Sequence, residues 1–147
     1  MRQPFYSAQE LADIAGIRLD EWGNWRRAYP SLRSRDDIIG GRGRVDAYTG
    51  STVFAVWAMA RLSEVGLRAS EAAEWAVALR PLAAEVSAVK RKASPGGRAL
   101  LFLNPVDGVA QVLHVTGTTT FGSWPAAFRG KSCIFVMDLA GLPDLEP

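Results

Sequence analysis

The sequence has a single cysteine, Cys133, and a single histidine, His114. One cysteine excludes an intrachain disulfide and a zinc site built from several thiolates. Cys133 is followed by apolar residues, which favours a buried, inert thiol, and the apolar neighbours of His114 favour a structural histidine. We therefore expect no metal site and no cofactor.

Catalytic motifs are also lacking. There is no second histidine for an acid–base pair, no glycine-rich phosphate loop ending in Lys-Ser/Thr, and no serine in a nucleophile-elbow sequence. The adjacent carboxylates Asp36 and Asp37 follow Arg33 and Arg35 closely, which indicates a surface whose charges neutralise one another. The sequence therefore predicts a protein that is not an enzyme.

No long hydrophobic run is present. The longest apolar stretch covers residues 53–60 and ends at Arg61, whereas a membrane-spanning helix needs about 20 residues. The first four residues lack the apolar segment of a secretory signal. We expect a cytoplasmic protein without a membrane partner.

Positive charge is concentrated in the first two thirds of the chain. The net charge is +2, but residues 1–98 carry 15 basic and 11 acidic side chains, whereas residues 99–147 carry 2 and 4. Arginine greatly outnumbers lysine, and its planar guanidinium suits bidentate contacts with phosphate and guanine. A basic binding surface therefore belongs to the N-terminal part.

Two short helices are expected near the N-terminus. Ser7 and Glu10 have the spacing of a capping box, which predicts a helix over residues 8–15 that ends at Gly16. A second helix is expected over residues 19–28, with Leu19 and Trp22 on its apolar face. Two helices joined by a tight glycine turn are typical of a helix-turn-helix.

A basic hairpin is expected next. Apolar residues 38–39 and residues 45–48 flank a Gly-Gly-Arg-Gly turn, which predicts a β-hairpin whose tip carries Arg42 and Arg44. Glycines at such a tip allow positive φ and a close approach of the backbone to a phosphate.

The rest of the chain changes from helical to strand periodicity. Helices are expected over residues 53–65 and 71–92, the second with a kink or break at Pro81. Residues 93–98 have the composition of a linker. Residues 99–103, 109–115 and 132–137 are β-rich, with a strong turn at residues 104–108. The predicted fold class is α+β, with a helix-turn-helix domain over residues 1–92 and a small antiparallel β unit over residues 99–147 as a candidate dimerisation surface.

The ordered set of motifs resembles the MerR-type winged helix-turn-helix domain and its excisionase-like relatives. The resemblance covers about residues 5–80. It rests on Tyr6-Ser7-x-x-Glu10-Leu11-Ala12-x-x-Ala15-Gly16-Ile17, Trp25-Arg26-Arg27, Gly43-Arg44 with Tyr48, and Arg61-Leu62-x-x-x-Gly66-Leu67. The second helix departs from the family pattern, because Asp20, Glu21 and Gly23 stand where family members place small polar and basic residues.

The resemblance implies a recognition helix in the major groove and a basic wing on the phosphate backbone or in the minor groove. The DNA-binding residues expected from it are Arg18, Asn24, Arg26, Arg27, Arg33, Arg35, Arg42, Arg44 and Tyr48. The expected function is that of a sequence-specific DNA-binding regulator acting on double-stranded DNA, and a homodimer would supply two reading heads. Two alternatives stay open: an excisionase-like architectural protein of a phage or mobile element, and a protein-interaction module on a winged-helix scaffold.

Overall fold

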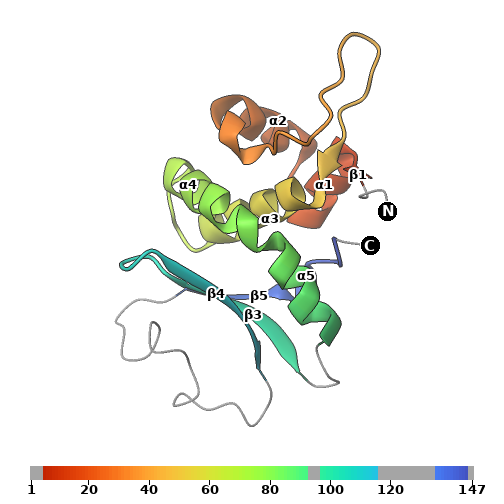
Figure 1. The fold of residues 1–147 in the computed structure, drawn as a ribbon. Coiled ribbons are helices and arrows are strands. Elements are labelled where there is room, and N and C mark those ends of the chain that lie inside the picture. Colours follow the sequence, from red (N-terminus) through yellow and green to blue (C-terminus); the bar gives the residue numbers. More distant parts are fainter. Residues whose placement is uncertain (1–4, 93–96, 116–134, 146–147) are drawn as a thin grey trace. The chain divides into compact units, whose positions relative to one another are not determined.

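The computed structural model describes residues 5–92, 97–115 and 135–145. These residues form a mixed α+β structure, in which helices are combined with two small antiparallel sheets (Figure 1). This agrees with the α+β class expected from the sequence. The chain divides into two compact units, of which unit 1 holds residues 1–83 and 145–147, and unit 2 holds residues 84–144.

Unit 1 begins with two short helices that follow their sequence signals. Helix α1 (Ala8–Ala15) starts at a capping box, in which the backbone N–H of Glu10 donates to Ser7 Oγ at 3.1 Å and the Ser7 N–H donates to the Glu10 carboxylate at 2.7 Å. It ends at Gly16, whose φ of 71° lies in the left-handed region that glycine adopts without strain. Helix α2 (Leu19–Ala28) follows after a short turn, and a 3-10 helix, η1 (Pro30–Leu32), follows α2. The bounds predicted for both α-helices are confirmed.

The predicted hairpin is reduced to one bridge. Ile38 and Ala47 exchange two backbone hydrogen bonds of 2.8 Å, and no longer ladder forms between the flanking residues. Strand β2 (Tyr48–Thr49) instead pairs with strand β1 (Phe5–Tyr6), a pairing that the sequence did not suggest. Tyr48, which was assigned to the hairpin, therefore pairs with strand β1 at the start of the chain.

Helix α3 (Gly50–Glu64) is the central element of unit 1. All residues from Thr52 to Ala60 are buried, and the helix packs against α1 and against helix α4 (Ala69–Leu79). Leu11, Trp22 and Trp57 are buried in the core of this unit, whereas Ile14 and Ile17 are half-buried.

The long helix predicted over residues 71–92 is interrupted. A 3-10 turn, η2 (Arg80–Leu82), with Pro81 in its first positions, separates α4 from helix α5 (Ala83–Lys92). The expected break is confirmed, since proline has no N–H to donate to the helical ladder. The boundary between the two units falls here, ahead of the predicted linker, of which residues 93–96 lie outside the described residues.

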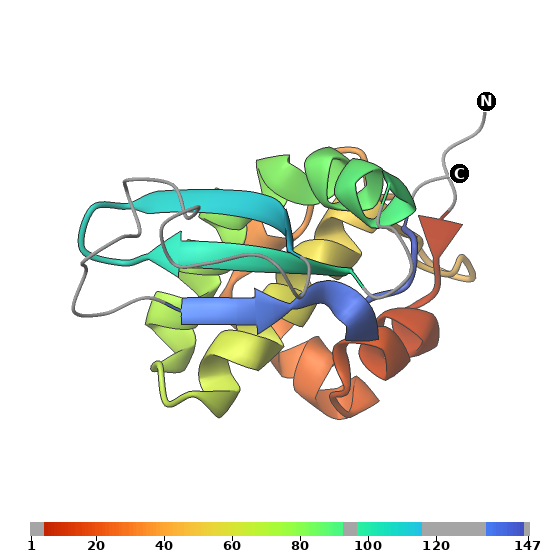
Figure 2. The ribbon, with the colours of Figure 1, turned by 90° about the horizontal axis from the view of Figure 1, so that it is seen from below.

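Unit 2 contains a three-stranded antiparallel sheet in the order β4-β3-β5, whose central strand is β3 (Figure 2). Strand β3 (Arg98–Asn104) pairs with β4 (Val109–Val115) and with β5 (Phe135–Asp138). The turn between β3 and β4 is fixed by the Asn104 side-chain oxygen, which accepts from the N–H groups of Val106 and Asp107. The small antiparallel β unit is therefore present, although residues 132–134 of its third predicted strand lie outside the described part.

Lys90 links α5 to the short 3-10 turn after β5, because its Nζ donates to the Leu139 carbonyl at 2.8 Å. Burial lowers the pKa of this ammonium, while Asp144 and Asp138 act in the opposite direction. His114 is exposed on β4, and Cys133 lies outside the described residues. In the ranges that the structure describes, no helix has the length and apolar character needed to cross a bilayer.

Candidate nucleic-acid interface

The turn between α1 and α2 is held from α3. Arg61 on α3 donates from Nη2 to the Ala15 carbonyl at 2.7 Å and forms an ion pair with Glu64 at 3.0 Å. A Cβ added to Gly16 would lie 3.2 Å from the same guanidinium nitrogen, so a larger residue would crowd this contact. The orientation of α2 is therefore set by a positive-φ glycine and by an arginine from a distant helix.

Helix α2 is anchored by a single large side chain. Trp22 is fully buried, and its ring meets the Tyr48 ring edge-on at a centroid distance of 5.3 Å. Leu19, which was expected to share this apolar face, is instead exposed. Asn24 and Arg27, on the opposite side of α2, are exposed.

Two of the expected contact residues, Asn24 and Arg27, are exposed on α2, and Arg18 is exposed at the N-cap position before it. Arg18 pairs with Asp20 at 3.3 Å, and both side chains are largely exposed, so this pair is weak. Arg27 donates from Nη2 to the Asn24 side-chain oxygen at 2.8 Å. The structure therefore brings Asn24 and Arg27 together one turn apart, with Gly23 beside them offering no side chain.

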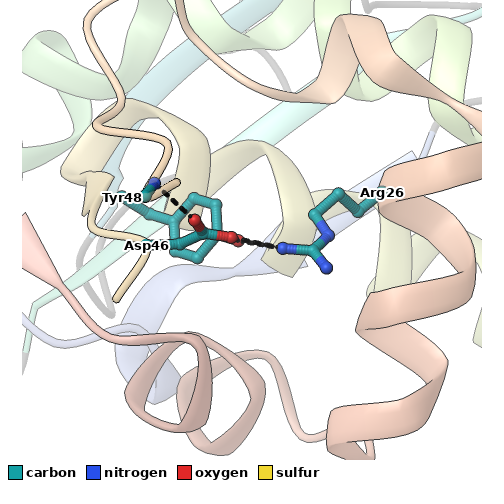
Figure 3. Close-up of polar contacts among 4 residues, drawn as sticks. Arg26, Asp46 and Tyr48 are labelled. Carbon is teal, nitrogen blue, oxygen red and sulfur yellow. Dashed lines mark hydrogen bonds and ion pairs between the residues drawn. The ribbon is translucent and has the colours of Figure 1, made fainter. Parts of the chain in front are cut away.

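Arg26 does not face outward with them. Its Nη1 pairs with the Asp46 carboxylate and donates to the Tyr48 hydroxyl at 3.0 Å (Figure 3). The pKa of Arg26 is raised, mainly by the hydrogen bond with Tyr48 and further by the negative charge of Asp46, against the opposing effect of burial. The guanidinium is thus engaged within the protein.

Tyr48 is also an internal residue. Its side chain is fully buried, and its hydroxyl donates to Asp46 at 3.2 Å. This burial corrects the expectation of a direct DNA contact by Tyr48, because a phosphate cannot reach a side chain without exposed surface. Tyr48 and Arg26 instead join strand β2 and helix α2 to the loop between them.

Asp46 was missed by the sequence analysis and is the centre of this cluster. Its carboxylate accepts from Arg26, from the Tyr48 hydroxyl and from the backbone N–H of Gly40 at 2.7 Å. We call Arg26, Asp46, Tyr48 and the Gly40 N–H the Asp46 clamp. No local pattern in the sequence marks Asp46, because Arg26 lies 20 residues away.

The segment between η1 and β2, residues 33–47, projects from the helices of unit 1 (Figure 1) and is here called the arginine loop. Its tip exposes Arg42 and Arg44, as expected. The Arg44 N–H donates to the Gly41 carbonyl at 3.0 Å, and Gly43 has a φ of 82°. A Cβ at Gly40 would lie 2.3 Å from the Arg44 carbonyl oxygen, so this tight tip requires glycine there.

The base of the arginine loop is fixed by Asp37. This carboxylate accepts four hydrogen bonds of 2.7 to 3.0 Å, from the N–H of Ser34, the N–H and hydroxyl of Thr49, and the hydroxyl of Thr52. The interpretation of Asp37 as a surface charge neutralised by neighbouring arginines is therefore wrong. It fastens the loop to the start of α3, while Asp36 is exposed.

Arg33 and Arg35 lie at this base, the first half-buried and the second exposed. The turn before them is held by Arg80, whose Nη1 donates to the carbonyls of Ser31, Leu32 and Arg33 at 2.6 to 3.2 Å. The backbone from which the Arg33 and Arg35 side chains extend is therefore held in place by these hydrogen bonds.

The surface formed by α2 and the arginine loop has a mixed charge. Its exposed arginines are Arg18, Arg27, Arg35, Arg42 and Arg44, and its exposed acids are Asp20 and Asp36. Elsewhere in residues 5–92, 97–115 and 135–145, no three His, Cys, Asp or Glu side chains gather closely enough to hold a metal ion. Such a surface can bind a polyanion by ion pairing.

Neither a protein-family model nor a curated protein sequence matches the chain.

Proposed function

We propose that the chain binds double-stranded DNA, with α2 as a recognition helix and the arginine loop as the wing of a MerR-like winged helix-turn-helix. The observation that carries the proposal is the exposed pair Arg42 and Arg44 on a glycine tip, fastened beside α2 by the Asp46 clamp. A basic loop held at a fixed place next to a short exposed helix suits simultaneous contacts with the backbone and a groove of a duplex.

The two elements have different tasks in this proposal. Arg42 and Arg44 neutralise phosphates or enter the minor groove, and Arg35 contacts the backbone at the base of the loop. Asn24 and Arg27 approach base edges in the major groove, where an arginine guanidinium suits guanine and an amide suits adenine. Arg26 supports these contacts from within the fold, because its guanidinium is already paired.

The function that follows is that of a transcriptional regulator. One winged helix-turn-helix domain covers only half of a two-fold symmetric operator, so we propose that the chain binds DNA as a homodimer. An architectural, excisionase-like role would use the same surface, and it would be recognised by strong bending of the DNA without a change in transcription of a neighbouring gene.

Docking of a protein partner is the second candidate. It is favoured by the exposed apolar residues Ile38, Ile39 and Val45, which lie in the same arginine loop as the basic tip. Apolar side chains gathered on an exposed surface often mark a protein interface.

The deciding experiment is a binding titration of the full chain with duplex fragments of its own genome at about 50 and about 200 mM salt. DNA binding predicts that affinity falls steeply between the two concentrations, because each neutralised phosphate releases counterions. Absence of salt-dependent binding to any duplex refutes the proposal and leaves protein docking as the favoured function.

A further inference from the structure

The geometry points to Asp46 as a positioning residue for DNA binding: a negatively charged side chain that strengthens the binding of a negatively charged ligand. The inference rests on the proposed function and names a residue outside the expected contact set. Simple charge counting predicts the opposite effect, since removing an acid from a DNA-binding surface should favour the duplex.

The Asp46 carboxylate connects three separate parts of the chain. It accepts from Arg26 on α2, from the Tyr48 hydroxyl on β2, and from the Gly40 N–H on the incoming side of the arginine loop. The Asp46 side chain is 19% exposed. A carboxylate that is partly shielded from water forms stronger hydrogen bonds than one at the open surface.

Little else among the described contacts fixes the course of the upper part of the arginine loop. Between the Ile38–Ala47 bridge and the tip, the described backbone contacts are the Gly41–Arg44 turn and the Gly40 N–H bond to Asp46. Three glycines, Gly40, Gly41 and Gly43, give this part of the backbone wide conformational freedom. The Asp46 clamp therefore restricts where the tip arginines can lie.

This restriction of the loop affects the free energy of DNA binding. Ordering a flexible loop on DNA costs conformational entropy, and a loop that is already ordered avoids that cost. With Asp46 in place, the arginines of the tip meet phosphates at a distance from α2 that is set before binding. Without it, the tip samples many positions, and at least one phosphate contact is lost.

The test compares Asp46→Asn with Asp36→Asn. Both replacements remove one negative charge from the arginine loop, but Asp36 is exposed, and the three partners of the Asp46 carboxylate remain in place in that variant. Asp46→Asn should bind duplex DNA more weakly than Asp36→Asn, by about eightfold in 0.1 M salt for one lost phosphate contact, with a salt slope shallower by about one unit.

A role that acts through the loop tip predicts non-additivity. When Arg42 and Arg44 are both alanine, the tip has no cation left to position, and Asp46→Asn should then bind no more weakly than Asp36→Asn on that background. A general loss of folded protein would instead lower the affinity by the same factor on both backgrounds. Equal penalties on the two backgrounds therefore overturn the inference.

The clamp itself has a signature that does not involve DNA. The Gly40 amide should exchange slowly with solvent deuterium in the unaltered protein and faster in Asp46→Asn, while amides in α3 keep their protection. Should Asp46→Asn fold poorly, Tyr48→Phe removes one hydrogen-bond partner of the carboxylate and keeps the ring against Trp22. It should show a smaller change of the same kind in both measurements.

The outcomes separate the two proposals. Salt-dependent binding by the unaltered protein, with equal affinities for Asp46→Asn and Asp36→Asn, overturns the positioning role alone. Loss of salt-dependent binding in the unaltered protein overturns the proposed function and the positioning role together. Weaker binding by Asp46→Asn, confined to the background that retains both tip arginines, supports the positioning role.

Discussion

Replacing both tip arginines by alanine gives the most direct test of the arginine loop. Arg42 and Arg44 are exposed, and surface substitutions of this kind change the free energy of unfolding by less than about 0.5 kcal/mol. The double variant should therefore keep the melting temperature of the unaltered protein. Any change in DNA binding then reports on contacts with the ligand.

The magnitude follows from counterion release. If each arginine neutralises one phosphate, the slope of log K against log salt concentration becomes shallower by about 1.8. The same relation predicts a loss of affinity of about 60-fold in 0.1 M salt and about 20-fold in 0.2 M salt. The loss should be similar for specific and random duplexes, because phosphate contacts carry no sequence information.

The assay is fluorescence anisotropy of a labelled duplex, titrated with protein at four salt concentrations. Arg68→Ala with Lys92→Ala is the matched control, because it removes the same charge from exposed positions outside α2 and the arginine loop. A double tip variant that shares the affinity and the salt slope of this control would refute the role of the loop. A weaker affinity with an unchanged slope would refute the phosphate contacts and leave another role for the tip.

Three further predictions concern the framework that presents this surface. Trp22→Ala should lower the free energy of unfolding by about 3–5 kcal/mol, measured by urea denaturation, because it removes the buried anchor of α2; unchanged stability would show that α2 is not packed through this ring. Asp37→Asn should lower the free energy of unfolding by about 2–3 kcal/mol in the same assay, since an amide nitrogen would replace one of the two oxygens that accept four hydrogen bonds. A loss below about 0.5 kcal/mol, which is typical of surface substitutions, would contradict the anchoring role. Gly50→Ala should lower the melting temperature, because the added Cβ would lie 2.7 Å from the Leu145 carbonyl oxygen. Gly23→Ala should raise it, because its Cβ meets no atom within 4 Å and alanine favours the helix. Equal shifts of the two melting temperatures would rule out the packing of Leu145 against Gly50.

The sequence by itself determined the elements that depend on neighbouring residues. The capping box at Ser7, the left-handed Gly16 and the proline at position 81 each act within one helical turn, so the bounds of α1, the turn after it and the break before α5 were predictable. The turn from Asn104 to Gly108 has the same local origin. Exposure of the tip arginines also followed from composition, since an arginine between glycines in a loop seldom finds a place in a core.

Only the tertiary structure decided which polar residues are partners and which are free for a ligand. Asp37 and Asp46 have the composition of surface acids in the sequence, yet one fastens the loop to α3 and the other to α2. Tyr48 fitted the position of a DNA-contact residue in the family motif, yet its ring is buried against Trp22. Hydrogen bonds between residues 12 to 22 positions apart leave no periodic signal in the sequence, because several arginines and carboxylates could form the same bonds. Which of them become partners is decided when the helices and strands β1 and β2 pack together.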